Sequence, residues 1–269
     1  AWVMNITKEA NFETLSAEQK KSLDAQLNEM IKHKYTFINY NGLRAQHLKD
    51  MTDNYKRNPF DNAVIIIDEA HNLVGRIVNK LKKPDSLSMR IYEYLLSATN
   101  ARVVALTGTP MINYPNELGV LFNILQGYIR SWSFKLNTPK KKKITQQTFE
   151  SMFKSTVKGG NITDLLEYKA STNTLTVTRN PFGFVNKVRK GMYDGMRVSS
   201  RGNISDTDFV SSITKLLLKD GIEIIPSGTQ VTQYKALPDT LEEFQSFFID
   251  DSQEVKNMEL FKRRILGLA

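Results

Sequence analysis

Strand-like and helix-like hydrophobic patterns alternate along the first half of the chain. Residues 64–67 form a short apolar run without polar alternation, and so do Val-Val-Ala-Leu within residues 102–106. This pattern is typical of strands buried on both faces of a parallel sheet. Apolar residues at helical spacing predict amphipathic helices at residues 16–34, 87–98 and 116–126. Because strands and helices alternate, we expect right-handed crossovers and an α/β fold with a parallel sheet.

Shorter elements are expected on either side of this region. The pattern predicts a strand at residues 35–39 and a short helix at residues 43–51. The middle third of the chain differs, because it reads as a hairpin at residues 165–178 and two short strands at residues 222–225 and 230–234. We interpret it as an α+β module inserted after the parallel sheet.

Composition narrows the functional classes. The 269 residues carry a net charge of +9 and no cysteine, which favours a polyanionic partner such as nucleic acid and excludes disulfides and thiolate metal sites. The three histidines lack zinc-binding spacing. No apolar run approaches the roughly 20 residues that span a bilayer, so no membrane association is expected. The chain starts at Ala1 and ends within a helix-like pattern, so we expect an internal fragment of a longer protein.

Polar residues follow each of the two apolar strands. Asp68 and Glu69 come directly after the first strand, and Thr107-Gly108-Thr109-Pro110 follows the second. In open α/β sheets, ligands bind at the carboxyl ends of the strands. An aspartate at such a strand end can hold Mg²⁺ through water, and an adjacent glutamate can deprotonate an attacking water. The sequence therefore places a candidate metal-assisted site at residues 68 and 69.

These strand ends resemble motifs of a known family. Asp68-Glu69-Ala70-His71 resembles motif II, the DEAH box, of superfamily 2 helicases and translocases, and Thr107-Gly108-Thr109-Pro110 resembles motif III. The order of strand, Thr-Gly-Thr-Pro turn, Asn113 and leucine-rich helix is similar to the Swi/Snf-type branch. Residues 178–183 and 260–267 are similar to the helicases of large DNA viruses, including the poxviral nucleoside triphosphatase I and early transcription factor ATPases.

The resemblance implies an ATPase site with ATP and Mg²⁺ as cofactors. Asp68 would hold the Mg²⁺ of the nucleotide through water, and Glu69 would activate the hydrolytic water. His71, Thr107 and Thr109 would couple hydrolysis to movement on nucleic acid. The implied fold is an incomplete RecA-like (P-loop NTPase) parallel sheet with flanking helices, plus an α+β insert.

The resemblance also divides the chain. Residues 1–135 correspond to part of a first RecA-like domain, residues 136–236 to the insert, and residues 237–269 to a helical linker into a second RecA-like domain. The chain contains no G-x-x-x-x-G-K-[ST] phosphate-binding loop, so nothing supplies the usual cradle for the β- and γ-phosphates. We therefore expect ATPase activity in the full-length protein and none in these 269 residues alone.

The expected protein is a motor that moves on nucleic acid, with DNA favoured over RNA and translocation favoured over strand separation. The viral resemblance implies a role in viral transcription, with viral RNA polymerase as a candidate partner. It also implies an intracellular location, in the host cytoplasm or nucleus or in the virion.

Several alternatives stay open. Lys140, Lys141, Lys142 and Lys143 would either contact nucleic-acid phosphates or form a solvated loop, and the same choice applies to the basic residues 262–264. Trp132 and Phe134 would either stack on bases or pack inside the protein. Ser97-Ala98-Thr99 copies another form of motif III, but it precedes the second strand, so we interpret it as an ordinary helix end.

Two other functional classes compete with the motor. One is a non-catalytic module, derived from a helicase, that binds nucleic acid or polymerase. The other is a Mg²⁺-dependent nuclease that uses Asp68 and Glu69. A nuclease would need further acids on neighbouring strand ends, where the sequence offers Thr107 and Thr109 instead.

Overall fold

The computed structural model describes residues 12–139, 144–155, 163–180, 184–189, 192–198, 204–252, 254–265 and 267–268. The chain divides into two compact units, residues 1–47 and residues 48–269.

The first unit contains a short 3-10 helix, η1 (Phe12–Thr14), and the long helix α1 (Ala17–Lys34). A capping box starts α1: the Ser16 hydroxyl accepts the Gln19 N–H at 3.2 Å, and the Gln19 side chain accepts the Ser16 N–H at 2.9 Å. The helix predicted at residues 16–34 is thus confirmed. None of its residues is buried, and Leu23, Leu27 and Met30 on its apolar stripe are half-buried.

The strand predicted at residues 35–39 is wrong. These residues form no regular element in the structure, and Phe37 is 79% exposed. Asn39 instead organises a turn, because its side-chain oxygen accepts the N–H groups of Asn41 and Gly42. An isolated strand cannot satisfy its backbone groups, and none of the described strands pairs with this segment. The short helix expected next forms as α2 (Ala45–Met51).

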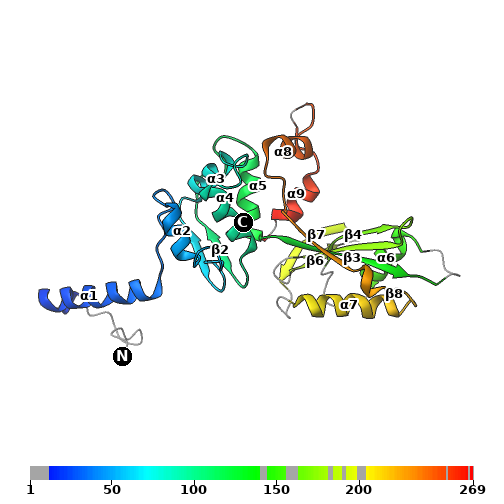
Figure 1. Cartoon of the computed structure of the whole chain (residues 1–269), viewed down its shortest axis with the longest axis horizontal. Helices are drawn as coiled ribbons and strands as arrows, with labels where there is room; N and C mark the ends of the chain where they lie inside the picture. Colours follow the sequence, from blue (N-terminus) through cyan, green and yellow to red (C-terminus); the bar gives the residue numbers. More distant parts are fainter. Residues whose placement is uncertain are drawn as a thin grey trace. The chain divides into compact units, whose positions relative to one another are not determined.

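The second unit begins with a parallel strand pair. Strands β1 (Val64–Ile67) and β2 (Arg102–Ala105) run in register, with Val64 opposite Arg102 and Ile67 opposite Ala105. Figure 1 labels β2 in this region. Their helices are α3 (Ala70–Val78), α4 (Leu87–Ser97) and α5 (Asn116–Gln126). The two predicted strands, their parallel pairing and the helices α4 and α5 are confirmed, whereas α3 was not predicted. The fold class is α/β.

The expectation that both faces of these strands are buried is wrong. Ile67 is buried, whereas Val64 and Ile66 are 70% and 60% exposed. Alternate residues of a strand point to opposite faces. Helix α5 packs against β2, but no described residue covers the face that carries Val64 and Ile66. A continuous apolar run therefore predicts a strand, but it does not show whether other elements cover both faces of that strand.

An antiparallel sheet follows the parallel pair. Strand β3 lies at its centre, and the order is β4-β5-β3-β8, with β9 also paired to β3. The bounds are β3 (Ile129–Asn137), β4 (Thr163–Lys169), β5 (Thr174–Arg179), β8 (Glu223–Ile224) and β9 (Gln230–Tyr234). The predicted hairpin and the two later strands are confirmed. The sequence reasoning missed β3, although its apolar residues alternate with polar ones as a half-buried strand requires.

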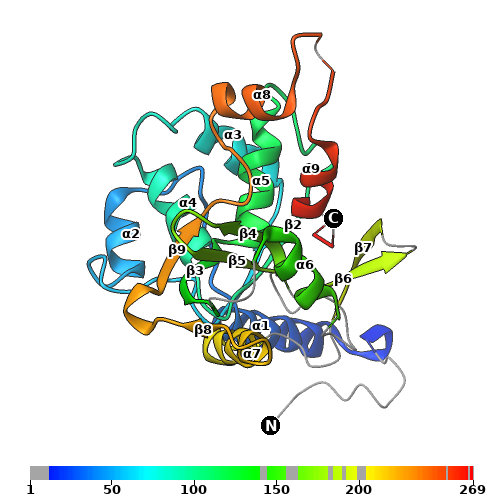
Figure 2. The same ribbon diagram turned by 90° about the vertical axis from the view of Figure 1, so that its right-hand side faces the viewer.

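The core of this region lies between the sheet and two helices, α6 (Gln146–Ser155) and α7 (Asp206–Leu218). Trp132 and Phe134 of β3 are 2% and 0% exposed within it. Their packing interpretation is therefore confirmed, and stacking on bases is excluded for these two rings. Strands β6 (Phe184–Arg189) and β7 (Met192–Val198) form a separate two-stranded sheet, drawn in yellow in Figure 2.

The chain then returns towards α5. A 3-10 turn, η3 (Pro226–Gly228), precedes β9, and the last helices are α8 (Leu241–Phe248) and α9 (Met258–Ile265). A second apolar cluster joins these helices to α5, including Phe122 from α5 with Phe244 and Phe248 from α8. The segment after β9 therefore packs against the parallel-sheet region.

Candidate active site

The end of β1 turns sharply into α3 at Glu69. Glu69 has a left-handed backbone (φ 47°), which is uncommon for a residue with a side chain. Helix α3 starts at the next residue, and the Ala70 N–H donates to the Leu106 carbonyl at 3.0 Å. Asp68 and Glu69 are exposed at this strand end. The Asp68 carboxylate accepts the Glu69 N–H at 3.1 Å.

The end of β2 lies beside the end of β1. The Leu106 N–H donates to the Ile67 carbonyl at 2.9 Å, which continues the parallel ladder past the last paired residues. Thr107 then turns the chain, because its hydroxyl accepts the Thr109 N–H at 3.1 Å. The two strand ends that the sequence singled out are thus adjacent.

His71 joins the two strand ends. Its Nδ1 lies 2.9 Å from the Thr107 hydroxyl and 3.4 Å from the Thr109 hydroxyl. The same nitrogen lies 3.4 Å from a carboxylate oxygen of Glu69. The His71 side chain is 19% exposed and that of Glu69 is 61% exposed. Of the five residues expected at the ATPase site, all except Asp68 therefore form one group of contacting side chains. In this group the Glu69 carboxylate is exposed to solvent and the His71 imidazole is largely covered.

Asp68 is suited to an indirectly held cation. No group of three or more His, Cys, Asp or Glu residues converges as a direct metal cage within the part of the chain that the structure describes. Mg²⁺ commonly keeps several waters and binds one or two carboxylates plus substrate phosphates. The exposed Asp68 carboxylate, beside an exposed Glu69, fits that mode of binding better than an all-protein cage.

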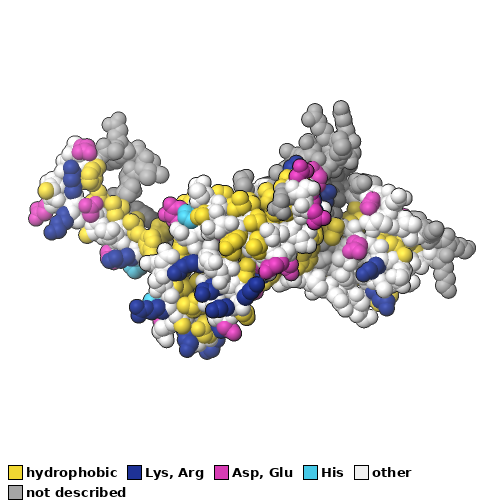
Figure 3. Space-filling view, turned by 90° about the horizontal axis from the view of Figure 1, so that it is seen from above, with side chains coloured by type: hydrophobic (Ala, Val, Ile, Leu, Met, Phe, Trp, Pro, Cys, Tyr) yellow, Lys and Arg dark blue, Asp and Glu magenta, His cyan; other side chains and the backbone are white. Residues whose placement is uncertain are grey.

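The structure describes only some of the basic residues that the sequence proposed for nucleic-acid contact. Lys140, Lys141, Lys142 and Lys143 lie outside the described residues. Arg264 is buried, and its Nη1 lies 3.0 Å from a carboxylate oxygen of Asp164 in β4, whose side chain is also buried. Phosphate contact by Arg264 is thus wrong, because this guanidinium is already committed to an internal ion pair. Elsewhere, Lys and Arg side chains gather over the middle of the face seen in Figure 3.

The second motif III-like triplet is a helix end, as predicted. Ser97 is the last residue of α4, and its hydroxyl donates to the Glu93 carbonyl at 2.7 Å. The Thr99 N–H and hydroxyl both donate to the Asp61 carboxylate, at 2.7 and 2.9 Å. These contacts close the loop that leads into β2 and lie away from the carboxyl ends of the strands.

The sequence did not predict a role for the buried polar residues of α5, which bind the loop after β2 and the segment after β9. Glu117 in α5 is 3% exposed, and its carboxylate accepts the N–H groups of Ile112 and Asn113 at 2.6 and 3.1 Å. Asn123 in the same helix is fully buried and bonds to Leu237. The available signal was a set of polar residues within a leucine-rich helix, where each buried polar group needs a partner.

A family comparison adds to this geometry. The model of the family described as type III restriction enzyme, res subunit, matches residues 3–112. Residues 3–112 are therefore similar to a helicase-family domain. This stretch contains both strand ends, so the parallel strand pair is part of a RecA-like domain, and the resemblance to superfamily 2 helicases of large DNA viruses is confirmed.

The chain has relatives among viral proteins. It is 30% identical over 105 residues to "Putative helicase 087L" of Invertebrate iridescent virus 3, an alignment that covers 39% of this chain and 10% of that protein. It is 36% identical over 69 residues to "Termination factor NPH-I homolog" of African swine fever virus, covering 26% and 10%. It is 38% identical over 66 residues to "Putative ATP-dependent RNA helicase R350" of Acanthamoeba polyphaga mimivirus, covering 23% and 8%.

The matched stretch thus spans about a tenth of the length of these relatives. No solved structure gives a significant match. Among the described residues, no helix combines the length and apolar character that a bilayer crossing requires.

Proposed function

We propose that the full-length protein is a nucleic-acid-dependent ATPase that couples ATP hydrolysis to movement along DNA or RNA, with DNA favoured. The observation that carries the proposal is the His71 contact with Thr107 and Thr109, made at the ends of two adjacent parallel strands inside the stretch that is similar to a helicase-family domain. A ligand at these strand ends would touch the acids of one strand and the hydroxyls of the other.

Each residue has a distinct proposed role. Asp68 would hold the Mg²⁺ that accompanies ATP, and the metal would neutralise phosphate charge. Glu69, exposed and within 3.4 Å of His71, would orient and deprotonate the attacking water. His71 would pass a change at Glu69 to the loop that carries Thr107 and Thr109. The side chains of Glu69, Thr107 and Thr109 all lie next to that of His71, so a displacement of one would shift the others.

The finer features of the function are proposals as well. The Thr-Gly-Thr-Pro turn, followed by Asn113 and α5, supports a Swi/Snf-like motor that translocates rather than unwinds. A relative is named as a termination factor homologue of African swine fever virus, which supports a role in viral transcription beside an RNA polymerase. Such a protein would act in the host cytoplasm or nucleus, or within the virion. The predicted division at residues 135 and 236 remains part of the proposal.

The decisive test is the Glu69→Gln variant of the full-length protein. It keeps the size of the side chain but removes the base, so we expect Mg²⁺-dependent ATP turnover to fall by about 10²–10⁴-fold, the usual contribution of a general base. ATP and DNA binding should persist, which equilibrium titrations can measure.

The matched control is Glu242→Gln. Glu242 is an exposed acid on α8 paired to Lys82 at 3.3 Å, so its loss should leave turnover within twofold, a change of under about half a kcal/mol. If the Glu69→Gln protein hydrolyses ATP at the wild-type rate, Glu69 is not the general base.

A non-catalytic binding module is the second candidate. The absence of a phosphate-loop motif from the 269 residues favours it. Full-length protein that binds DNA but lacks Mg²⁺-dependent ATP turnover would establish the module in place of the motor. The nuclease alternative has less support, because hydroxyl groups rather than further acids lie beside His71.

A further inference from the structure

Helix α5 buries an unusual set of polar side chains for a helix packed in a core. Asn116, Glu117, Asn123 and Gln126 are 1%, 3%, 0% and 8% exposed. Buried polar groups are costly unless they are paired. The backbone partners of the first three lie in two segments, one just before α5 and one more than 100 residues after it. Residues 107–115 are here called the tip loop, and residues 235–240 the return segment.

Glu117 holds the tip loop. One oxygen of its carboxylate accepts two consecutive backbone N–H groups, from Ile112 at 2.6 Å and from Asn113 at 3.1 Å. The two residues lie just beyond Pro110, in the loop that begins with Thr107. The position of the tip loop is therefore tied to the first turn of α5.

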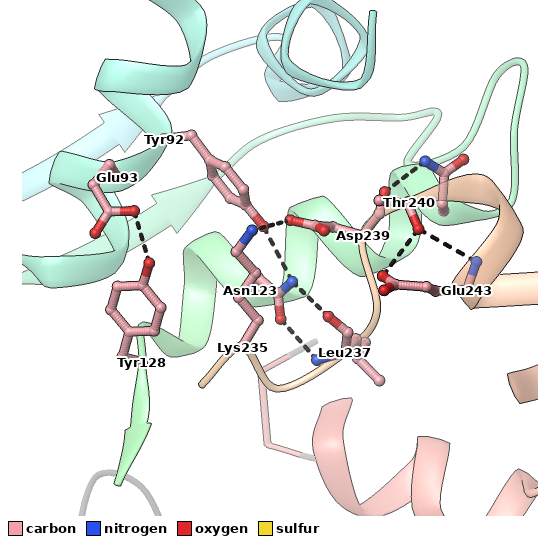
Figure 4. Close-up of polar contacts among 10 residues, drawn as sticks. Tyr92, Glu93, Asn123, Tyr128, Lys235, Leu237, Asp239, Thr240 and Glu243 are labelled. Carbon is pink, nitrogen blue, oxygen red and sulfur yellow. Dashed lines mark hydrogen bonds and ion pairs between the residues drawn. The ribbon is translucent and has the colours of Figure 1, made fainter. Parts of the chain in front are cut away.

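Asn116 and Asn123 hold the return segment, and Figure 4 shows the contacts of Asn123. The Asn123 amide makes a pair of bonds to Leu237, donating to its carbonyl at 2.9 Å and accepting its N–H at 2.9 Å. The Asn116 amide donates to the Asp239 carbonyl at 2.7 Å. All three bonds are made to backbone groups, so they fix the register of the segment on the helix.

Gly119 allows this close contact. A Cβ atom at position 119 would lie 2.2 Å from the Pro238 carbonyl oxygen, well inside any real contact. Residues 116, 119 and 123 are spaced three and four apart, so they line one face of α5. The return segment thus lies directly on the helix backbone at Gly119, between the side-chain amides of Asn116 and Asn123.

Side chains close over the outside of this contact. The Tyr92 hydroxyl accepts from Asn123 at 3.1 Å, and Lys235 pairs with Asp239 at 2.6 Å (Figure 4). The segment then ends at Thr240, whose hydroxyl accepts the Glu243 N–H and so caps α8. The start of α8 is therefore set by where the return segment lies on α5.

We propose that α5 mechanically couples the tip loop to the return segment, with Glu117 as the positioning residue at one end and Asn116, Gly119 and Asn123 as the receiving face. A displacement of the Thr107–Pro110 turn would weaken the hydrogen bonds between α5 and the return segment, and it would thereby shift the start of α8. Coupling between two sites is reciprocal, so a change in the return segment must also be felt in the tip loop.

Hydrogen–deuterium exchange on the 269-residue chain tests this reciprocity without nucleotide, so the result is independent of the proposed ATPase. The variants Asn123→Ala and Gly119→Ala perturb the return segment in two ways, by deleting a side-chain amide and by adding a clash. Glu117→Ala perturbs the tip loop. We expect each variant to raise exchange in both residues 107–115 and residues 235–249 by at least about fivefold, the lower end of typical coupling.

The matched control is Gln126→Ala, which deletes another buried amide from α5. Its side-chain oxygen has no hydrogen-bond partner among the described residues, so exchange in the two segments should stay unchanged relative to β3 and β5. Exchange that rises only in the segment bonded to the mutated residue would overturn the proposal. An equal rise in Gln126→Ala would also overturn it, because the effect would then be general loosening of the helix.

Discussion

At the residue scale, the positions of the Glu69 and His71 side chains depend on the backbone conformation at the end of β1. The left-handed conformation of Glu69 turns β1 directly into α3 and costs roughly 1–2 kcal/mol for an ordinary residue. That turn places His71 in the first turn of the helix, where its imidazole reaches Thr107 and Thr109. A strained residue at a candidate site is a reasonable pointer to function when contacts accompany it.

Tyr92 supplies a pH-dependent prediction at this scale. Burial raises the pKa of Tyr92 well above its ordinary value of about 10, and the negative charge of Asp239 raises this pKa further, while the hydrogen bond from Asn123 lowers it. Above about pH 10, the unfolded chain releases the phenol proton and the folded chain retains it. The free energy of unfolding therefore falls as the pH rises.

The Tyr92→Phe variant tests this sign. At pH 8 it should lose about 1 kcal/mol of stability, since the hydroxyl no longer accepts from Asn123. Between about pH 10 and 12, its free energy of unfolding should fall less steeply than that of the wild type. Urea titrations across this range measure the slope, and identical slopes would show that Tyr92 does not contribute.

At the element scale, α9 shows how a basic run can serve structure. Its apolar residue Phe261 joins the cluster around α8, while the buried Arg264 reaches Asp164 in β4. The guanidinium also lies over the Tyr234 ring of β9, 6.0 Å from its centre. This helix therefore ties the end of the described chain to the antiparallel sheet through one buried charge pair.

Removal of one partner from this pair should be strongly destabilising. Arg264→Met leaves Asp164 buried without its cation, so we expect a loss of about 3–5 kcal/mol in the free energy of unfolding. The double variant Arg264→Met/Asp164→Leu should recover much of it, because no uncompensated charge remains. Lys262→Met is the control: Lys262 pairs with Glu259 at 3.6 Å with both side chains exposed, so its loss should cost under about 1 kcal/mol.

At the scale of the whole molecule, the described residues make up one part of the proposed motor. The helicase-family match covers residues 3–112, while the antiparallel sheet, its helices and α8–α9 follow that match. The chain spans about a tenth of the relatives reported above. Catalysis by a P-loop ATPase needs a phosphate cradle in addition to Asp68 and Glu69, and the chain has no phosphate-loop motif.

The isolated 269 residues should therefore lack ATPase activity. Without the cradle, the β- and γ-phosphates have no backbone N–H groups to hold them, so Mg²⁺-dependent phosphate release should match the buffer blank with and without DNA. A phosphate-release assay on the purified chain checks this, with full-length protein as the positive control. Robust turnover that the Glu69→Gln variant abolishes would contradict the prediction and place a complete site within these residues.

The sequence predicted most of the elements because their signals are local. A capping box and apolar periodicity define α1, short apolar runs define β1 and β2, and a leucine-rich stretch followed by Gly127 defines α5. The candidate site was predictable for a related reason. Parallel strands place their carboxyl ends at the same edge of a sheet, so residues 68–71 and 107–110 had to lie near one another once both strands were recognised.

Only the tertiary structure decided which groups are buried and which are exposed. The local pattern at Val64 and Ile66 is that of a buried strand, yet both are exposed, and the pattern at Arg264 is that of a solvated basic run, yet it is buried. Glu117 and Asn123 acquire their roles from backbone groups brought to α5, in the case of Asn123 from 114 residues away. Burial and long-range pairing depend on which segments meet in space, and no local periodicity records that.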